Sequence, residues 1–129
     1  MDTKFVAAIY LINMGQYDLA AEYIRKAIKS LDGEGCEEKI IMYTCVLGEL
    51  FAKMGDVAMA REEFDKVIRY CNVTNSLSEQ KEIALGYLKK FAADEKKQNE
   101  KRKKAAAAEE KPIYTNLMPN TTQTTYFLQ

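Results

Sequence analysis

The feature that most constrains the fold of this chain is an internal repeat with a step of forty residues. Residues 4–30, laid over residues 44–70, give seven identities in 27 positions. Most matches fall on apolar positions and on a glycine that follows a methionine. The identical pairs are Val6/Val46, Met14/Met54, Gly15/Gly55, Ala20/Ala60, Glu22/Glu62, Lys26/Lys66 and Ile28/Ile68. Matches at these positions indicate two units that pack in the same way.

Apolar residues in both units recur at helical spacing, and no segment shows the alternation of a strand. The chain is therefore predicted to be all-α, with five helices. Asp18 and Ser78 are the expected caps of the second and fifth helices, and Pro112 is expected to end the fifth. The first helix is expected to end near Met14, the second to run from about 18 to 31 and the third from about 37 to 54. The fourth and fifth helices are expected to follow Gly55-Asp56 and Asn75-Ser76, respectively.

The forty-residue step continues into a third unit that has only its first helix. It aligns Leu11 with Phe51 and Phe91, and Glu95 stands where a turn glycine would be. We therefore expect two full units and a long C-terminal capping helix. The predicted parts are a repeat domain at 1–93, a charged, solvated helix at 94–111 and a Thr- and Asn-rich tail at 112–129. The tail either is flexible or docks on a helical groove through its apolar residues.

With this pattern the chain resembles the tetratricopeptide repeat, a helix-turn-helix unit with fixed small and aromatic positions. The first unit supplies Ala7, Ala8, Leu11, Gly15, Tyr17, Ala20, Ile24 and Ala27; the second supplies Leu47, Gly48, Phe51, Gly55, Ala60, Phe64 and Val67. The step is longer than the usual thirty-four residues. Asp32 and Asn72 stand where the family has a closing proline. The loop between units is therefore expected to be longer and the stacking less regular.

The resemblance implies a protein or peptide partner, because the first helices of such repeats line a concave groove. By position, ten residues are expected on that groove: Phe5, Ile9, Ile12 and Asn13, then Met42, Cys45, Glu49 and Lys53, then Leu85 and Lys89. Two other interpretations of Phe5, Ile9 and Ile12 stay open, namely that they belong to the core or to a contact between copies in a homo-oligomer. Repeats that clamp chaperone C-termini have Lys and Asn where this chain has Phe5 and Ile9, so that subtype is not expected.

A looser resemblance links residues 47–68 to the last helical pair of bacterial uncharacterised proteins in which a zinc ribbon precedes such helices. Their metal-binding part has no counterpart in this sequence, so no zinc site is implied. The chain also has no histidine, the commonest metal ligand and general base. We therefore expect no metal, no cofactor and no enzymatic activity.

Composition narrows the setting further. The formal net charge is zero, and no stretch approaches the roughly 20 apolar residues of a membrane span. Three cysteines, Cys36, Cys45 and Cys71, form no paired pattern and fit a reducing compartment, so a cytoplasmic location without membrane contact is expected.

The basic run at residues 96–104 supports an alternative function, an accessory subunit that contacts nucleic acid or a nucleoprotein through the fifth helix. Asp94, Glu95 and Glu100 interrupt the positive charge, and no aromatic residue interleaves to stack on bases. A solvated helix face is therefore the preferred interpretation. The favoured function is a non-enzymatic protein–protein interaction module, an adaptor, scaffold or oligomerising unit.

Overall fold

The computed structural model describes the backbone of residues 3–116 and the side chains of residues 3–107. Within these residues the chain forms five α-helices and no strand, which confirms the all-α prediction. The helices are α1 (Thr3–Asn13), α2 (Tyr17–Leu31), α3 (Glu37–Lys53), α4 (Val57–Thr74) and α5 (Ser78–Asn116).

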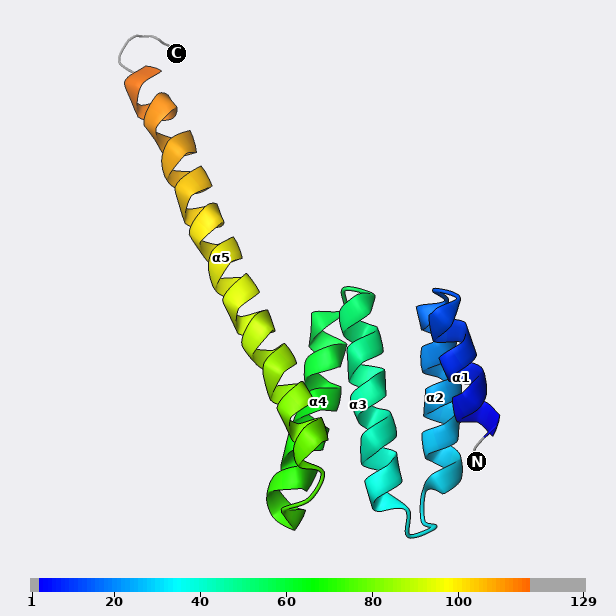
Figure 1. The fold of residues 1–129 in the computed structure, drawn as a ribbon. Helices are drawn as coiled ribbons and strands as arrows, with labels where there is room; N and C mark the ends of the chain where they lie inside the picture. The colour runs from blue at the N-terminus through cyan, green and yellow to red at the C-terminus, as the bar shows by residue number, and fades with distance from the viewer. Residues whose placement is uncertain (1–2, 117–129) are drawn as a thin grey trace. The chain divides into compact units, whose positions relative to one another are not determined.

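The first four helices form two helix-turn-helix pairs, α1–α2 and α3–α4, and their connections alternate between two ends of the stack (Figure 1). α2 packs against α3, so the two pairs share one core. The first part of α5 joins this core, because the ring of Phe64 on α4 stacks on Tyr87 of α5 with 4.9 Å between the ring centroids. Two full units followed by a long C-terminal helix are therefore confirmed.

The turn inside each pair has the same construction. Gly15 and Gly55 adopt positive φ angles of 77° and 82°, a left-handed conformation that glycine reaches without steric cost. One residue, Gln16 or Asp56, follows each glycine and occupies the N-cap position of the next helix. Asp56 accepts a hydrogen bond from the Met59 amide at 3.2 Å, whereas its repeat counterpart Gln16 makes no side-chain cap.

The prediction that Asp18 caps the second helix is therefore wrong. Asp18 lies inside the first turn of α2, where its carboxylate accepts a hydrogen bond from the amide of Leu19 at 3.0 Å. The helix starts earlier because the capping position follows directly after the turn glycine, as it does at Asp56.

Small residues allow the first four helices to approach closely. Ala8, Ala20 and Ala60 are fully buried. Among the described residues, the largest side chains without solvent contact are Phe64, Ile24, Leu50 and Val67. Ala20 and its identical counterpart Ala60 thus lie in the shared core, as do Ile24 and its counterpart Phe64, whereas the matching Met14 and Met54 are exposed.

The turn between α4 and α5 contains two non-glycine residues with left-handed φ angles, Asn75 at 54° and Leu77 at 55°. The Leu77 carbonyl accepts from the Lys81 amide at 3.0 Å and from the Cys71 thiol at 3.5 Å. Leu77 therefore occupies the position before the helix, and Ser78, the expected cap, is its first residue.

Helix α5 crosses a division of the chain into two compact units, distinct from the repeat units, which we call unit 1 (up to Phe91) and unit 2 (from Ala92). In unit 2 every described side chain, from residue 92 to residue 107, is exposed. The helix continues past Pro112 to Asn116, beyond its expected end. A proline lacks one amide donor, but its fixed φ angle lies in the helical range. The rest of the predicted tail, residues 117–129, lies outside the described residues.

Candidate functional site

A groove lies between α1 and the first half of α3, and we call it the α1 groove. Its volume is about 840 Å³. Two stacked rings join its walls, Phe5 of α1 and Tyr43 of α3, with centroids 4.1 Å apart and ring planes within 5°. The seven lining residues are Phe5, Val6, Ile9, Tyr10, Asn13, Lys39 and Tyr43.

The exposed part of the α1 groove is mainly apolar. Val6 is 42% exposed, Ile9 40% and Tyr10 71%, although all three have large side chains with apolar surface. Large exposed apolar side chains that cluster on one surface are typical of sites where another molecule binds. Lys39 carries the one charge at neutral pH among the seven lining residues.

Three of the ten residues expected on a concave groove lie together here: Phe5, Ile9 and Asn13. Ile12 is half-buried against the core instead. Lys53 is exposed, with its ammonium 6.0 Å from the ring centroid of Tyr17. Leu85 and Lys89 are exposed on α5.

The remaining expected residues, all on α3, lie apart from the α1 groove. Met42 lines a separate hollow with Tyr70. Cys45 is only 2% exposed, because its thiol packs under α5, 3.9 Å from the carbonyl oxygen of Gln80. Its side chain therefore offers no surface to a partner in this structure. Glu49 lines a hollow between α3 and α5.

Four residues of the α1 groove were missed: Val6, Tyr10, Lys39 and Tyr43. Ile9 lies three positions and Tyr10 four positions after Val6 on the same helix, and this spacing places Ile9 and Tyr10 beside Val6 on one helical face. That signal was available in the sequence. Lys39 and Tyr43 could not be predicted from such spacing, because only the packing of α3 against α1 brings them to this groove.

The hollow between α3 and α5 has a different character from the α1 groove. The Tyr87 hydroxyl donates a hydrogen bond to Glu49 Oε2 at 3.3 Å. Burial raises the pKa of Tyr87, and the nearby Glu49 carboxylate raises it further. The phenol therefore stays protonated as a donor at neutral pH, and Glu82 and Lys90 complete a charged lining.

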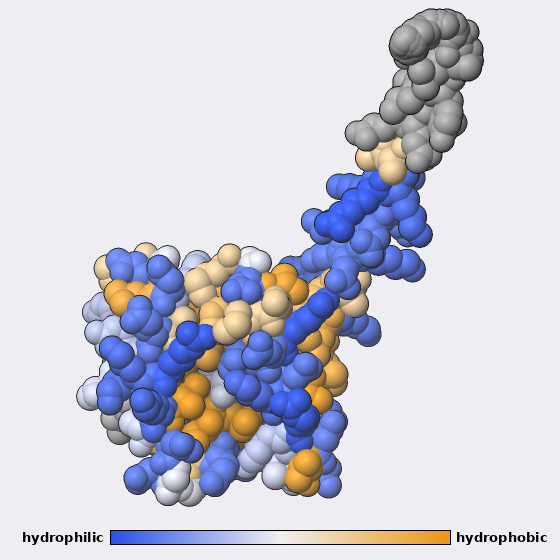
Figure 2. All heavy atoms as spheres, turned by 180° about the vertical axis from the view of Figure 1, so that it is seen from behind, coloured by the Kyte–Doolittle hydropathy of each residue, from blue (hydrophilic) through white to orange (hydrophobic). Residues whose placement is uncertain are grey.

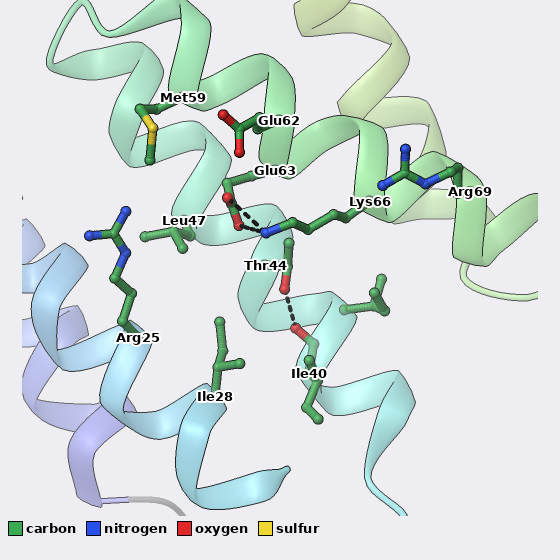
Figure 3. Close-up of a pocket in the computed structure, with 11 residues that line it drawn as sticks. Arg25, Ile28, Ile40, Thr44, Leu47, Met59, Glu62, Glu63, Lys66 and Arg69 are labelled. Atoms are coloured by element: carbon green, nitrogen blue, oxygen red, sulfur yellow. Dashed lines mark hydrogen bonds and ion pairs between the residues drawn. The ribbon is translucent and has the colours of Figure 1, made fainter.

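Another groove, of about 630 Å³, lies between α2 and α4 over α3, and we call it the α2–α4 groove (Figure 3). Glu63 is 6% exposed, and Lys66 donates to its two carboxylate oxygens at 3.2 and 3.5 Å. Arg25 lies over the ring of Phe51, with its guanidinium carbon 5.1 Å from the ring centroid. The buried Glu63 carboxylate of the α2–α4 groove thus already has Lys66 as an internal partner. Figure 2, turned to the back of the view in Figure 1, shows hydrophobic surface between hydrophilic edges.

The three cysteines are free thiols, and two of them are buried. Burial raises the pKa of Cys45 to about 12, and the Glu49 carboxylate contributes to the same shift. Burial also raises the pKa of Cys71. Since the thiolate is the reactive form of cysteine, both thiols are held in their unreactive state.

In the part of the chain that the structure describes, no group of three or more His, Cys, Asp or Glu side chains is placed to hold a metal ion. Of the helices described, none combines the length and the apolar character that crossing a bilayer requires.

Comparison with known proteins agrees with the geometry. The family model of the tetratricopeptide repeat matches residues 4–30, which contain nearly all of α1 and α2. With the all-helical fold and the repeated α3–α4 pair, this match supports a helical repeat of the tetratricopeptide type. Such repeats generally serve as protein–protein interaction modules and are typically non-catalytic. No curated protein and no solved structure matches the chain significantly. The looser likeness to zinc-ribbon proteins stays a prediction.

Proposed function

We propose that this chain is a non-enzymatic interaction module that holds an apolar segment of a partner protein in the α1 groove. In this role it acts as an adaptor, a scaffold or an oligomerising unit. The observation that carries the proposal is the combination of three exposed apolar side chains, Val6, Ile9 and Tyr10, on one helix that lines a groove.

The energetics favour this surface over the α2–α4 groove and over the hollow beside Glu49. Fully burying one large apolar side chain contributes about 1.5–3 kcal/mol, so covering three that are 40% exposed or more contributes several kcal/mol in total. In the α2–α4 groove, a ligand would compete with the Glu63–Lys66 ion pair. The hollow beside Glu49 is also lined with charge and would require its desolvation.

The test is affinity capture with the full chain as bait, compared between the wild type, Ile9→Glu and Val73→Glu. Val73 is a matched control because it is 83% exposed and lines none of the grooves described above. A partner retained by the wild type and by Val73→Glu, but lost by Ile9→Glu, supports the α1 groove. Equal retention by all three proteins contradicts it, provided that circular dichroism shows the same fold for each.

Light scattering on the same three proteins tests the oligomerising role. If a second copy fills the groove, Ile9→Glu lowers the average mass and Val73→Glu does not. If all three proteins are monomers, the oligomerising role is excluded and the adaptor or scaffold role remains.

A second candidate, contact with nucleic acid or a nucleoprotein through α5, has one supporting observation. The whole basic run at residues 96–104 is exposed. A salt titration separates the two functions, because contacts to phosphates weaken steeply with salt and apolar groove binding does not.

A further inference from the structure

The exposed face of α1 carries the apolar stripe that is typical of a helix-packing surface. Val6, Ile9 and Tyr10 follow the i, i+3, i+4 spacing of one helical stripe. Forty residues later, the counterparts of Val6 and Tyr10 are covered: Val46 is half-buried and Leu50 is 1% exposed.

The charge distribution in the α1 groove is one-sided. Lys39 is exposed and lines the groove, and none of the seven lining residues is acidic. Glu37 and Glu38, its neighbours on α3, do not line the groove; they line the adjacent hollow that contains Met42 and Tyr70, which Lys39 also borders. An occupant of the groove therefore meets a cation beside apolar surface, and a carboxylate on the occupant would complement it.

Two candidate occupants from this chain fit this pattern poorly. The α1 helix of a second copy has no acidic residue, since its sequence is TKFVAAIYLIN. Its one charge is another lysine. The described part of unit 2 has no apolar stripe, because residues 92–107 carry only charged side chains, amides and alanines.

We propose that the α1 groove takes an amphipathic helix from a different protein, one with an apolar stripe flanked by Asp or Glu that pairs with Lys39. This inference rests on the proposed function and narrows its partner class. The helix packs its apolar stripe on Val6, Ile9 and Tyr10. Its acidic flank lies over the α3 side of the groove.

The test is a display library of 16-residue helical peptides with leucines fixed at i, i+3, i+4 and i+7 and every flanking position randomised between Glu and Lys. The library is selected on the full chain as wild type, Lys39→Glu and Ile9→Glu. We expect the wild type to retain Glu-flanked peptides about two- to fivefold more tightly than Lys-flanked ones, the range of an exposed ion pair. Lys39→Glu should reverse this preference, and 0.5 M NaCl should reduce it.

The outcomes separate this inference from the proposed function. If peptide binding depends on Ile9 but shows no preference for Glu, or a preference for Lys, the acidic partner helix is contradicted and the groove remains an apolar binding site. Failure to retain any peptide overturns the helical partner, and capture of a partner by the wild type but not by Ile9→Glu still supports the groove. If the wild type retains no partner in affinity capture and no peptide in display, the proposed function is contradicted as well. Self-association lost in Ile9→Glu assigns the groove to a second copy and overturns the inference.

Discussion

Gly48 of α3 lies directly against the ring of Phe64 on α4. A Cβ atom built on Gly48 would stand 2.7 Å from Phe64 Cε1, a distance that real Cβ atoms essentially never show. Phe64 has no solvent exposure and stacks on Tyr87, so its ring has little freedom to move. The glycine is therefore required for the close approach of α3 and α4.

Gly48→Ala should destabilise unit 1 by about 1–3 kcal/mol, the usual cost of overpacking a filled core. Gly86→Ala on α5 is the matched control, because a Cβ atom there meets nothing within 4 Å. That control should be neutral or slightly stabilising, since alanine favours helix over glycine by about 1 kcal/mol. Equal midpoints of urea unfolding for the two variants would show that the helix contact at Gly48 is not as close as described.

Ala60→Leu should also destabilise the fold, because Ala60 is completely buried between helices. We expect a loss of about 1–3 kcal/mol from overpacking. Ala58→Leu, on the same turn of α4 but exposed, controls for the change of residue type and should stay within about 0.5 kcal/mol of the wild type. Thermal melting of both variants checks this; no loss for Ala60→Leu would contradict the packing of the second unit.

The two capping positions offer a reciprocal test. Asp56→Ala should cost about 1 kcal/mol, because it removes the acceptor for the Met59 amide. Gln16→Asp should stabilise by a similar or smaller amount, on the order of 0.5–1 kcal/mol. Its backbone angles, φ −93° and ψ 71°, nearly equal those of Asp56 at φ −90° and ψ 80°. Chemical denaturation measures both changes, and a destabilised Gln16→Asp variant would contradict the equivalence of the two turns.

Stability should fall at alkaline pH through the Cys45 thiol. Burial raises the pKa of this group from 9.0 to about 12 in the folded state. The unfolded chain therefore loses its proton first, and the contribution is complete below pH 9 and disappears as the pH rises from 9 towards 12. Between pH 8 and pH 10 the loss should be about 1 kcal/mol.

Urea unfolding at a series of pH values measures this effect, with Cys45→Ala as the test and Cys36→Ala as the control. Cys36 is half-exposed, so its replacement should leave the pH dependence unchanged. Cys45→Ala lowers the stability at every pH but should flatten the decline above pH 9. The same slope in all three proteins would contradict a buried, protonated thiol at this position.

Much of the fold was predictable because its determinants are local or repeated. Gly15 and Gly55 mark the turns, and the apolar residues of each unit recur with the helical period, so five helices and two units followed from the sequence. Errors arose at helix ends. Asp18 was a better capping residue than Gln16 by type, but the geometry of the turn fixed the start of α2 two residues earlier.

The candidate site was predictable only in part, since a groove belongs to two helices. Phe5, Ile9 and Asn13 were found from their positions in the first unit. Transferring the same positions to the second unit selected Cys45, which α5 covers, and passed over Tyr43, which stacks on Phe5. Which residues of α3 face α1 depends on how the helices pack, and the sequence pattern of one helix does not contain that information.

The exposure of every described side chain from residue 92 to residue 107 has a consequence for how this protein unfolds. A helix without a buried face draws its stability from local propensity and charge pairs, so it melts gradually with temperature. The core of unit 1 is expected to unfold in one cooperative transition. Far-ultraviolet and near-ultraviolet signals will therefore diverge on heating, and a two-state fit to helix content alone will underestimate the enthalpy of the core transition.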